Sequence, residues 1–562
     1  MKVMKFGGTS VASAESILKV MEIVTACREE KVVVVAAMGD TTDQLEELSI
    51  KAATGDESYK EGLAVVEKLH LKAIEQLIAP RDRGSVIAKI KFLFNELTAA
   101  LHGVYILHEL TPRTTDYLLS FGERLSAMIL SSAMPDSIYV DAREIIRTDN
   151  KHGRATVDFE TTNQLVIEKL ASLTGIPVIT GFIASTAQNE TTTLGRRGSD
   201  YTGAIIAAAL DASKLEIWTD IDGILTADPL KVEKAYCIES LSYPEAMELS
   251  YFGARVIYPP ALVPVYKKNI PIQIRNTFNI QNKGTLITTN ANIDVTKPIK
   301  GISSIENINL VTILGSGMVG VTGISNRLFG ALAKSKVNVV LISQASSEYS
   351  ITFAVIDKDS DRAKLAIEKE FLHEINSGNI HQVAIEKEMA IVAIVGENMK
   401  KTPGIAGKFF NTLGRNGINV RAIAQGASEL NISCVIEVKD LKKALNTIHE
   451  SFFLSEYQQC NVFIVGTGAV GSKLIEQIQV QQSKLLKQHR LKLNVCGIMN
   501  SRLMLINPNG LELNDYSSQL KEIGIKADLN TFIDQIRFVC RYIGANVAQN
   551  SGCLQRFDRR EV

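Results

Sequence analysis

The sequence lacks the patterns that would mark a nucleic-acid-binding, membrane or disulfide-rich protein. Its 61 Lys and Arg residues balance 61 Asp and Glu residues, so no overall field attracts nucleic acid or an anionic membrane. No apolar run approaches the roughly 20 residues that span a bilayer, and the opening MKVMKFGGTS does not resemble a signal peptide. The seven cysteines are scattered without a CxxC pair, which is typical of free thiols in a reducing compartment. We therefore expect a cytoplasmic protein with no membrane or nucleic-acid partner and no protein-bound metal.

The first half of the chain alternates short apolar runs with longer helical patterns. The runs at 3–6, 32–37, 178–183 and 215–218 have the composition of strands buried on both faces, and 16–24 has helical spacing. Strands that alternate with helices predict an α/β domain with a mostly parallel sheet covered on both sides. A polar stretch closes this region near Thr289, so we place the first domain at 1–290. At roughly 150 residues per domain, the whole chain has room for three or four domains.

The opening KFGGTS suits phosphoryl transfer, which needs N–H donors at the phosphates and a fixed cation. Gly7 and Gly8 allow backbone N–H groups to approach closely, and Lys5 supplies a cation at a strand end. The Walker pattern GxxxxGK[ST] is absent from the sequence. Taken alone, KFGGTS is better explained as a glycine turn without a function.

Two later clusters carry arginine and acidic residues after apolar segments. In TTTLGRRGSDYT, Arg196 lies in a glycine-bracketed loop and suits bidentate capture of a carboxylate, while Asp200 begins an alanine-rich helix. In WTDIDG, a strand delivers Thr219 and Asp220 to its carboxyl end, where parallel sheets bind ligands. The alternatives are a surface arginine, a helix-capping aspartate and an acidic turn.

Five motifs in a fixed order identify a family resemblance. KFGGTS (5–10), FGERLS (121–126), TTLGRRGSDYT (192–202), WTDIDGILTADP (218–229) and ELSYFGARVIYP (248–259) together resemble aspartate kinases of the amino-acid-kinase superfamily. The resemblance runs from Met1 to about Thr289. It implies the amino-acid-kinase fold, with L-aspartate and ATP as substrates and Mg²⁺ held largely by the ATP phosphates. The substrate carboxylate is ionised at pH 7 and is itself the nucleophile, so no general base is needed.

The same resemblance implies a role for each matched residue. The implied catalytic residues are Lys5 and Asp200, and the implied aspartate contacts are Thr42 in a TTDQL loop, Glu123, Arg196 and Ser199. The implied nucleotide contacts are Gly7, Gly8, Thr9, Thr219, Asp220 and Arg255. The chain departs from the family pattern at Leu225, Leu230 and Arg255, near the nucleotide. These departures keep two alternatives open, namely a non-catalytic amino-acid-binding regulator and another kinase of the superfamily.

The next region contains an internal repeat. VNVVLISQASSEYSITFAV begins at 337 and INVRAIAQGASELNISCVI at 418, a shift of 418 − 337 = 81 residues. Each copy reads strand, glycine loop, helix, strand, turn, strand, which predicts a paired α+β module. The copies resemble ACT domains, at 300–385 and 386–457, which bind amino acids and pair with one another. The resemblance implies a homodimer or homotetramer and ligand contacts from four amide side chains, those of Asn338, Gln344, Asn419 and Gln425. Amides both donate and accept hydrogen bonds, although they also close turns.

The last region, 458–562, begins with a glycine motif for dinucleotide binding. Gly466, Gly468 and Gly471 form GxGxxG directly after an apolar strand and before a helix, the context that an NAD(P) site requires. The order of parts resembles the bifunctional aspartokinase–homoserine dehydrogenase family, as do MELSYFGA and SQASSEYSI, and this favours threonine over lysine as effector. The rest of that family's dehydrogenase does not follow. We therefore expect a truncated, partial Rossmann unit that lacks partner strands, is poorly ordered and has no dehydrogenase activity.

Overall fold

The computed structural model describes residues 1–195, 197–251, 258–289, 298–344, 349–381, 383–454, 458–489, 491–508 and 510–542. The chain divides into two compact units, Met1–Lys408 with Asn419–Leu441, and Phe409–Ile418 with Lys442–Val562. Within the described ranges, no helix has both the length and the apolar character that crossing a bilayer demands.

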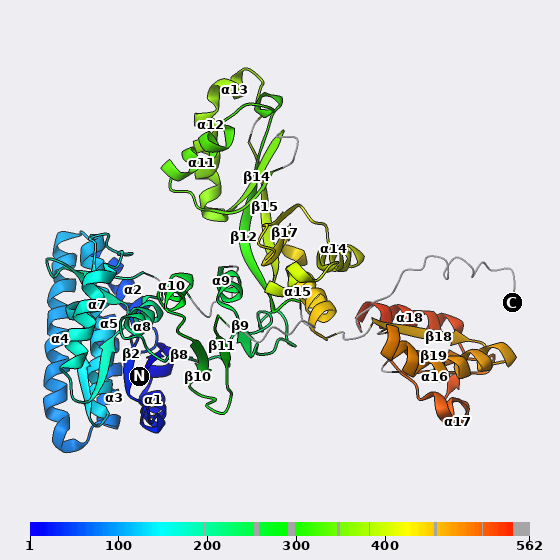
Figure 1. The fold of residues 1–562 in the computed structure, drawn as a ribbon, viewed down its shortest axis with the longest axis horizontal. Coiled ribbons are helices and arrows are strands. Elements are labelled where there is room, and N and C mark those ends of the chain that lie inside the picture. The colour runs from blue at the N-terminus through cyan, green and yellow to red at the C-terminus, as the bar shows by residue number, and fades with distance from the viewer. Residues whose placement is uncertain are drawn as a thin grey trace. The chain divides into compact units, whose positions relative to one another are not determined.

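An eight-stranded sheet forms the centre of the N-terminal region (Figure 1). Its strand order is β3-β5-β2-β1-β8-β10-β11-β9, and every pair is parallel except β10–β11. This confirms the mostly parallel sheet. The strands are β1 (Lys2–Phe6), β2 (Lys31–Val35), β3 (Ser137–Val140), β5 (Ile176–Thr180), β8 (Lys214–Thr219), β9 (Ser240–Leu241), β10 (Ile272–Asn276) and β11 (Thr285–Ile287).

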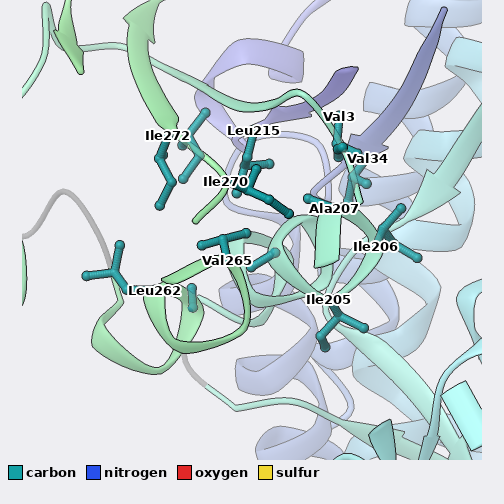
Figure 2. Close-up of a cluster of buried hydrophobic side chains, with 14 of the residues drawn as sticks. Val3, Val34, Ile205, Ile206, Ala207, Leu215, Leu262, Val265, Ile270 and Ile272 are labelled. Carbon is teal, nitrogen blue, oxygen red and sulfur yellow. The ribbon is translucent and has the colours of Figure 1, made fainter. Parts of the chain in front are cut away.

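Helices cover both faces of this sheet because alternate residues of each strand point to opposite sides. Val3 and Val34 belong to one buried core, and Met4 and Val35 belong to the other. The first core lies against α8, and Figure 2 shows its side chains between the strands, α8 and α10. The second lies against α1 to α5. The helices are α1 (Ala14–Ala26), α2 (Thr41–Ala53), α3 (Tyr59–Leu77), α4 (Pro80–Leu107), α5 (Pro112–Ala133), α6 (Ala142–Ile145), α7 (Phe159–Ala171), α8 (Gly198–Ala209), α9 (Tyr243–Tyr251) and α10 (Pro259–Lys267).

The predicted single strand at 178–183 is wrong, because the chain breaks there. β5 ends at Thr180, and β6 (Ile183–Thr186) joins a separate three-stranded sheet with β4 (Arg147–Thr148) and β7 (Thr191–Thr193). Phe182 has φ +65°, which interrupts an extended strand. A Cβ on Gly181 would lie 2.6 Å from the Cβ of Ser199, so glycine lets the start of α8 approach the sheet closely.

The repeat folds into one six-stranded sheet, as predicted for a paired module. Its order is β13-β14-β12-β15-β17-β16, with β12 and β15 antiparallel at the centre. The corresponding helices α11 and α14 begin 81 residues apart (405 − 324 = 81), as do α12 and α15 (441 − 360 = 81), whereas the edge strands β13 and β16 begin 83 residues apart (422 − 339 = 83). The expected boundary between 385 and 386 falls inside β15. The elements are β12 (Gly301–Leu314), α11 (Ile324–Lys334), β13 (Val339–Gln344), β14 (Ser350–Ile356), α12 (Ser360–Glu370), α13 (Leu372–Asn376), β15 (Ala384–Val395), α14 (Ile405–Arg415), β16 (Ala422–Gln425), β17 (Asn431–Glu437) and α15 (Leu441–His449).

The C-terminal region begins with a strand–helix–strand unit, as the glycine motif predicts. β18 (Gln458–Val465) and β19 (Leu491–Met499) are parallel and are joined by α16 (Ala469–His489). The expectation that this sheet lacks partner strands is wrong, because the chain folds back into two antiparallel strands that extend it. These are β20 (Leu503–Ile506) and β21 (Ile525–Lys526). α17 (Tyr516–Glu522) lies between them in the chain, and α18 (Leu529–Tyr542) follows β21.

Candidate active site

A buried ion pair lies at the carboxyl end of the central strand. Lys5 Nζ on β1 lies 2.6 Å from Asp200 Oδ1 in the first turn of α8, and the two residues are 6% and 4% exposed. Gly203, one turn further along α8, makes room for this lysine, because a Cβ there would lie 3.3 Å from the Cβ of Lys5. The alternative role of Asp200 as a helix cap is not what the fold uses, since its carboxylate meets Lys5. A fixed cation is thus held at the end of the sheet where ligands bind.

The glycine loop after β1 is packed against its neighbours. Gly8 must be glycine, because a Cβ there would lie 2.8 Å from the carbonyl oxygen of Gly39. The Gly7 N–H donates to the Trp218 carbonyl oxygen at 3.0 Å. The prediction that this amide serves a phosphate therefore needs correction, because the amide holds the loop to β8. Among the described residues, none accepts a hydrogen bond from the N–H of Gly8 or Thr9, so these two remain the candidate phosphate donors.

Glu123 on α5 contributes a carboxylate with one oxygen to spare. Its Oε1 accepts a hydrogen bond from the Ala37 N–H at 3.3 Å. Its Oε2 is buried and, within the part of the chain that the structure describes, has no hydrogen-bond partner. Burial raises the pKa of the Glu123 carboxyl to about 8, against the opposing effects of the Ala37 N–H and the Lys5 charge. An unpaired buried carboxylate is costly, so this oxygen is suited to a cationic ligand group.

Thr42 lies near Gly122, the residue before Glu123, and it is not in a loop as predicted. It belongs to the first turn of α2, which begins at Thr41 after the turn at Gly39. A Cβ on Gly122 would lie 2.8 Å from the Cβ of Ala37 and 3.6 Å from Thr42 Oγ1. The glycine of FGERLS thus brings α5 against the start of α2, with Thr42 next to the residue that precedes Glu123.

The predicted nucleotide segment at the end of β8 is held by the end of β10. Thr219 accepts a hydrogen bond from the Thr277 N–H at 2.8 Å, and Asn276 Nδ2 donates to the Asp220 carbonyl oxygen at 3.3 Å. The hydroxyls of Ser10 and Thr277 lie 2.7 Å apart and are fully buried, which connects the glycine loop to the same segment. The side chain of Asp220 is exposed. Sequence reasoning assigned no role to Ser10, Asn276 or Thr277.

Three predicted residues of this site remain, and the structure describes one of them. Ser199 is described and buried at the start of α8, next to Gly181. Arg196 and Arg255 lie outside the described residues. The described part of the chain contains no cluster of His, Cys, Asp and Glu that could hold a metal ion.

A second candidate site lies between the edge strands of the six-stranded sheet. A cavity of about 480 Å³ opens where β13 approaches β16. Gln344 and Gln425 line it at equivalent positions of the two repeats, whereas Asn338 and Asn419 are exposed and do not line it. The other lining residues are Val340, Leu341, Ile342, Ser343, Ile423, Ala424, Gly426, Asn431 and Ser433. Its volume is ample for an amino acid.

Helix α9 of the N-terminal region contacts the lining of this cavity. Asn431 Nδ2 donates to Glu248 Oε2 at 2.5 Å, and the Tyr251 hydroxyl donates to the Val340 carbonyl oxygen at 3.4 Å. Asn431 and Val340 both line the cavity. Two hydrogen bonds therefore connect the candidate effector site to the helix that contains Ser250 and Tyr251, the first two residues of the SYFGA motif.

Comparison with known proteins agrees with this arrangement. The amino acid kinase family matches residues 1–276, and the ACT domain matches residues 311–371 and 392–452. Aspartokinase 1, chloroplastic, from Arabidopsis thaliana is 34% identical over 473 residues, which cover 81% of this chain and 80% of that protein. The chain belongs to the aspartate kinase family. The E. coli aspartokinase III structure with aspartate and ADP matches this family member with a TM-score of 0.70 and 27% identity, over 81% of the chain and 100% of the neighbour.

A bifunctional relative extends the similarity beyond the kinase and ACT regions. Bifunctional aspartokinase/homoserine dehydrogenase 1, chloroplastic, from Arabidopsis thaliana is 37% identical over 544 residues. The match covers 95% of this chain and 60% of the relative, so the chain spans less than two thirds of that protein's length. The resemblance of this aspartate kinase family member to the bifunctional branch is thereby confirmed.

The predicted dinucleotide residues lie together in the C-terminal unit. Gly466 directly follows β18 with φ +95°, and a Cβ on Gly471 would collide with the Gly466 carbonyl oxygen. Gly468 immediately precedes α16. The glycine loop thus has the tight turn that the motif requires.

Proposed function

We propose that this chain transfers the γ-phosphoryl group of ATP to the side-chain carboxylate of L-aspartate. The bond between the γ-phosphorus and the β,γ-bridging oxygen breaks, and a new bond forms to a carboxylate oxygen, giving 4-phospho-L-aspartate and ADP. No proton needs to move, because the nucleophile is already ionised. Lys5 would offset charge on the transferring group, and the Gly8 and Thr9 amides would face the phosphates. Mg²⁺ would be held mainly by the ATP oxygens, near Asp200.

The observation that carries this proposal is the unpaired Oε2 of Glu123. This buried carboxylate oxygen lies in the same site as the Lys5–Asp200 ion pair, and a substrate ammonium group would complete its interactions. A site with both a phosphate-binding cation and an ammonium-binding carboxylate suits an amino acid as phosphoryl acceptor. N-acetylglutamate lacks that ammonium group, so this geometry disfavours the related acetylglutamate chemistry.

The test is a coupled assay of ADP release with L-aspartate, L-glutamate and N-acetylglutamate. We expect turnover with aspartate alone, and a loss of at least about a hundredfold in Lys5→Met, as for removal of an electrostatic catalytic group. Lys2→Met is the matched control, because Lys2 lies on the same strand but pairs with Glu29. Full activity in Lys5→Met would refute the catalytic assignment. Aspartate binding without ADP release by the wild type would favour a non-catalytic regulator.

We also propose that the cavity between β13 and β16 binds an amino-acid effector, with threonine favoured over lysine. Of its described lining residues none is charged, so nothing there would neutralise the side-chain ammonium of lysine. Gln344 and Gln425 would bind the effector's own ammonium and carboxylate. Thermal shifts with threonine, lysine and methionine test this choice, and Gln344→Ala should abolish the threonine shift. A larger shift with lysine would reject the assignment.

Three further predictions from the sequence remain proposals. β13 and β16 are edge strands, which supports a homodimer or homotetramer formed through the ACT regions. The Gly466–Gly471 loop supports a partial NAD(P) site, and the absence of dehydrogenase activity stays a prediction. A cytoplasmic location likewise stays a prediction, since both named plant relatives are chloroplastic.

A further inference from the structure

Asp116 is a buried carboxylate on α5 that none of the five family motifs includes. It is 1% exposed, and its two oxygens accept several hydrogen bonds. The Thr193 hydroxyl donates to Oδ1 at 2.6 Å, and the Thr193 N–H donates to Oδ2 at 3.2 Å. The Gly153 N–H lies 3.1 Å from Oδ1 and 3.0 Å from Oδ2, and His152 Nδ1 lies 3.1 Å from Oδ2. One carboxylate therefore binds two segments that are far apart in the sequence.

Those two segments are held together just before the arginine loop. Thr193 is the last residue of β7, and its carbonyl oxygen also accepts a hydrogen bond from the Ala155 N–H at 3.0 Å. The next residue, Leu194, donates through its N–H to the Phe182 carbonyl oxygen at 2.9 Å. α8 begins at Gly198. The short loop between Thr193 and Gly198 thus has both ends fixed, and Asp116 fixes the first of them.

The same helix also carries Glu123, seven residues after Asp116. Seven residues are about two turns of an α-helix, or roughly 10 Å, so both side chains project from nearly the same face. Glu123 faces the proposed ammonium subsite. The loop that Asp116 anchors contains Arg196, the proposed partner of the α-carboxylate. A single helix therefore carries both the proposed ammonium partner and the residue that anchors the start of the loop containing Arg196.

We propose that Asp116 is a positioning residue that gives the site its selectivity for an α-carboxylate beside the α-ammonium group. The inference rests on the proposed aspartate site. Asp116 does not touch the substrate but acts through Thr193 and the loop that follows it. An ionised carboxylate only accepts hydrogen bonds, whereas an amide presents an NH₂ donor on one side. Asp116→Asn would direct this NH₂ at the N–H or hydroxyl donors of Thr193 and Gly153, and the anchor would loosen.

The test compares L-aspartate with β-alanine, which keeps the ammonium group and the reacting carboxylate but lacks the α-carboxylate. Calorimetric titration of the full-length protein measures binding of each compound, and the ADP-release assay measures KM for aspartate and for ATP. In Asp116→Asn we expect KM for aspartate to rise about tenfold or more, with KM for ATP changed by less than about twofold. The preference for aspartate over β-alanine should fall by a similar factor.

A second pair of variants addresses folding. Thr193→Val removes one donor to Asp116 and should reproduce the loss in part, while Thr193→Ser keeps the hydroxyl and should behave as wild type. Ser120→Ala is the matched control, because Ser120 is buried on the same helix and, among the residues that the structure describes, its hydroxyl bonds only within that helix, to the Tyr117 carbonyl oxygen. In the double variant Asp116→Asn with Thr193→Val, the two effects should not add, because both remove the same contact.

Three results would overturn the proposal. The first is an unchanged preference over β-alanine in folded Asp116→Asn and in Thr193→Val. The second is an equal rise in KM for both substrates, which marks general damage. The third is a loss in Ser120→Ala as large as in Asp116→Asn. Because binding is measured apart from turnover, selective binding of aspartate without ADP release would reject the kinase proposal and leave the positioning role supported.

Discussion

The pH dependence of aspartate use follows from the buried carboxyl of Glu123. Burial raises its pKa to about 8, so the group is mostly neutral in the free protein at pH 7. The substrate ammonium requires the ionised form. With a pKa of about 8, the ionised fraction is about 3% at pH 6.5 and about half at pH 8, so kcat/KM for aspartate should rise about 15-fold across that range.

Steady-state rates at low aspartate and saturating MgATP, from pH 6.5 to 8, measure this rise. Glu123→Gln should have a lower kcat/KM that is nearly flat over the same range, because the titrating group is gone. KM for ATP should vary little in either protein. A wild-type profile that is flat between pH 6.5 and 8, or one that persists unchanged in Glu123→Gln, would refute the assignment of Glu123 as the ammonium partner.

Three further predictions concern other contacts of the same chain. Gly8→Ala should destabilise the protein by about 1–3 kcal/mol in a denaturant titration and lower kcat, because its Cβ would press on the Gly39 carbonyl oxygen. Thr277→Val should raise KM for ATP more than KM for aspartate, since it removes the hydroxyl that meets Ser10; equal changes would count against the link. Glu248→Ala should leave the uninhibited rate intact and weaken threonine inhibition several-fold, within the usual coupling of about 1–3 kcal/mol, whereas unaltered inhibition would exclude this route.

The sequence predicts the strands well where each is buried on both faces. The runs at 3–6, 32–37 and 215–218 correspond to β1, β2 and β8, because such strands read as uninterrupted apolar segments. The run at 178–183 differs from these because it contains Thr180 and Gly181, and it breaks at Gly181 and Phe182. The glycine is a local sign of such a break, whereas its cause, the close approach of α8, is a tertiary contact that the sequence does not show.

The site residues that belong to family motifs could be predicted from the sequence, whereas those outside such motifs could not. Lys5 and Asp200 lie in separate motifs, and the structure brings them within 2.6 Å. Asp116 could not be found in this way, because its partners at 153 and 193 are distant in the sequence and are mostly backbone groups. The use of the Gly7 amide was also hidden, since a glycine loop looks the same whether its N–H faces a phosphate or a neighbouring carbonyl.

Charge balance in the buried site gives the binding of aspartate a definite consequence. Lys5 and Asp200 form a neutral pair, and with its pKa near 8 the neighbouring Glu123 is mostly neutral too, so these three groups together carry little net charge at pH 7. An incoming ammonium group stabilises ionised Glu123, which must release its proton. The positive charge of the substrate ammonium group and the negative charge of the ionised Glu123 then cancel. The summed charge of Lys5, Asp200, Glu123 and the ammonium group therefore stays near zero before ATP binds. Aspartate binding at pH 7 should therefore release close to one proton per site, so the calorimetric binding enthalpy should vary with the ionisation enthalpy of the buffer. A binding enthalpy independent of the buffer would show that Glu123 is already ionised and that the ammonium group meets a preformed charge.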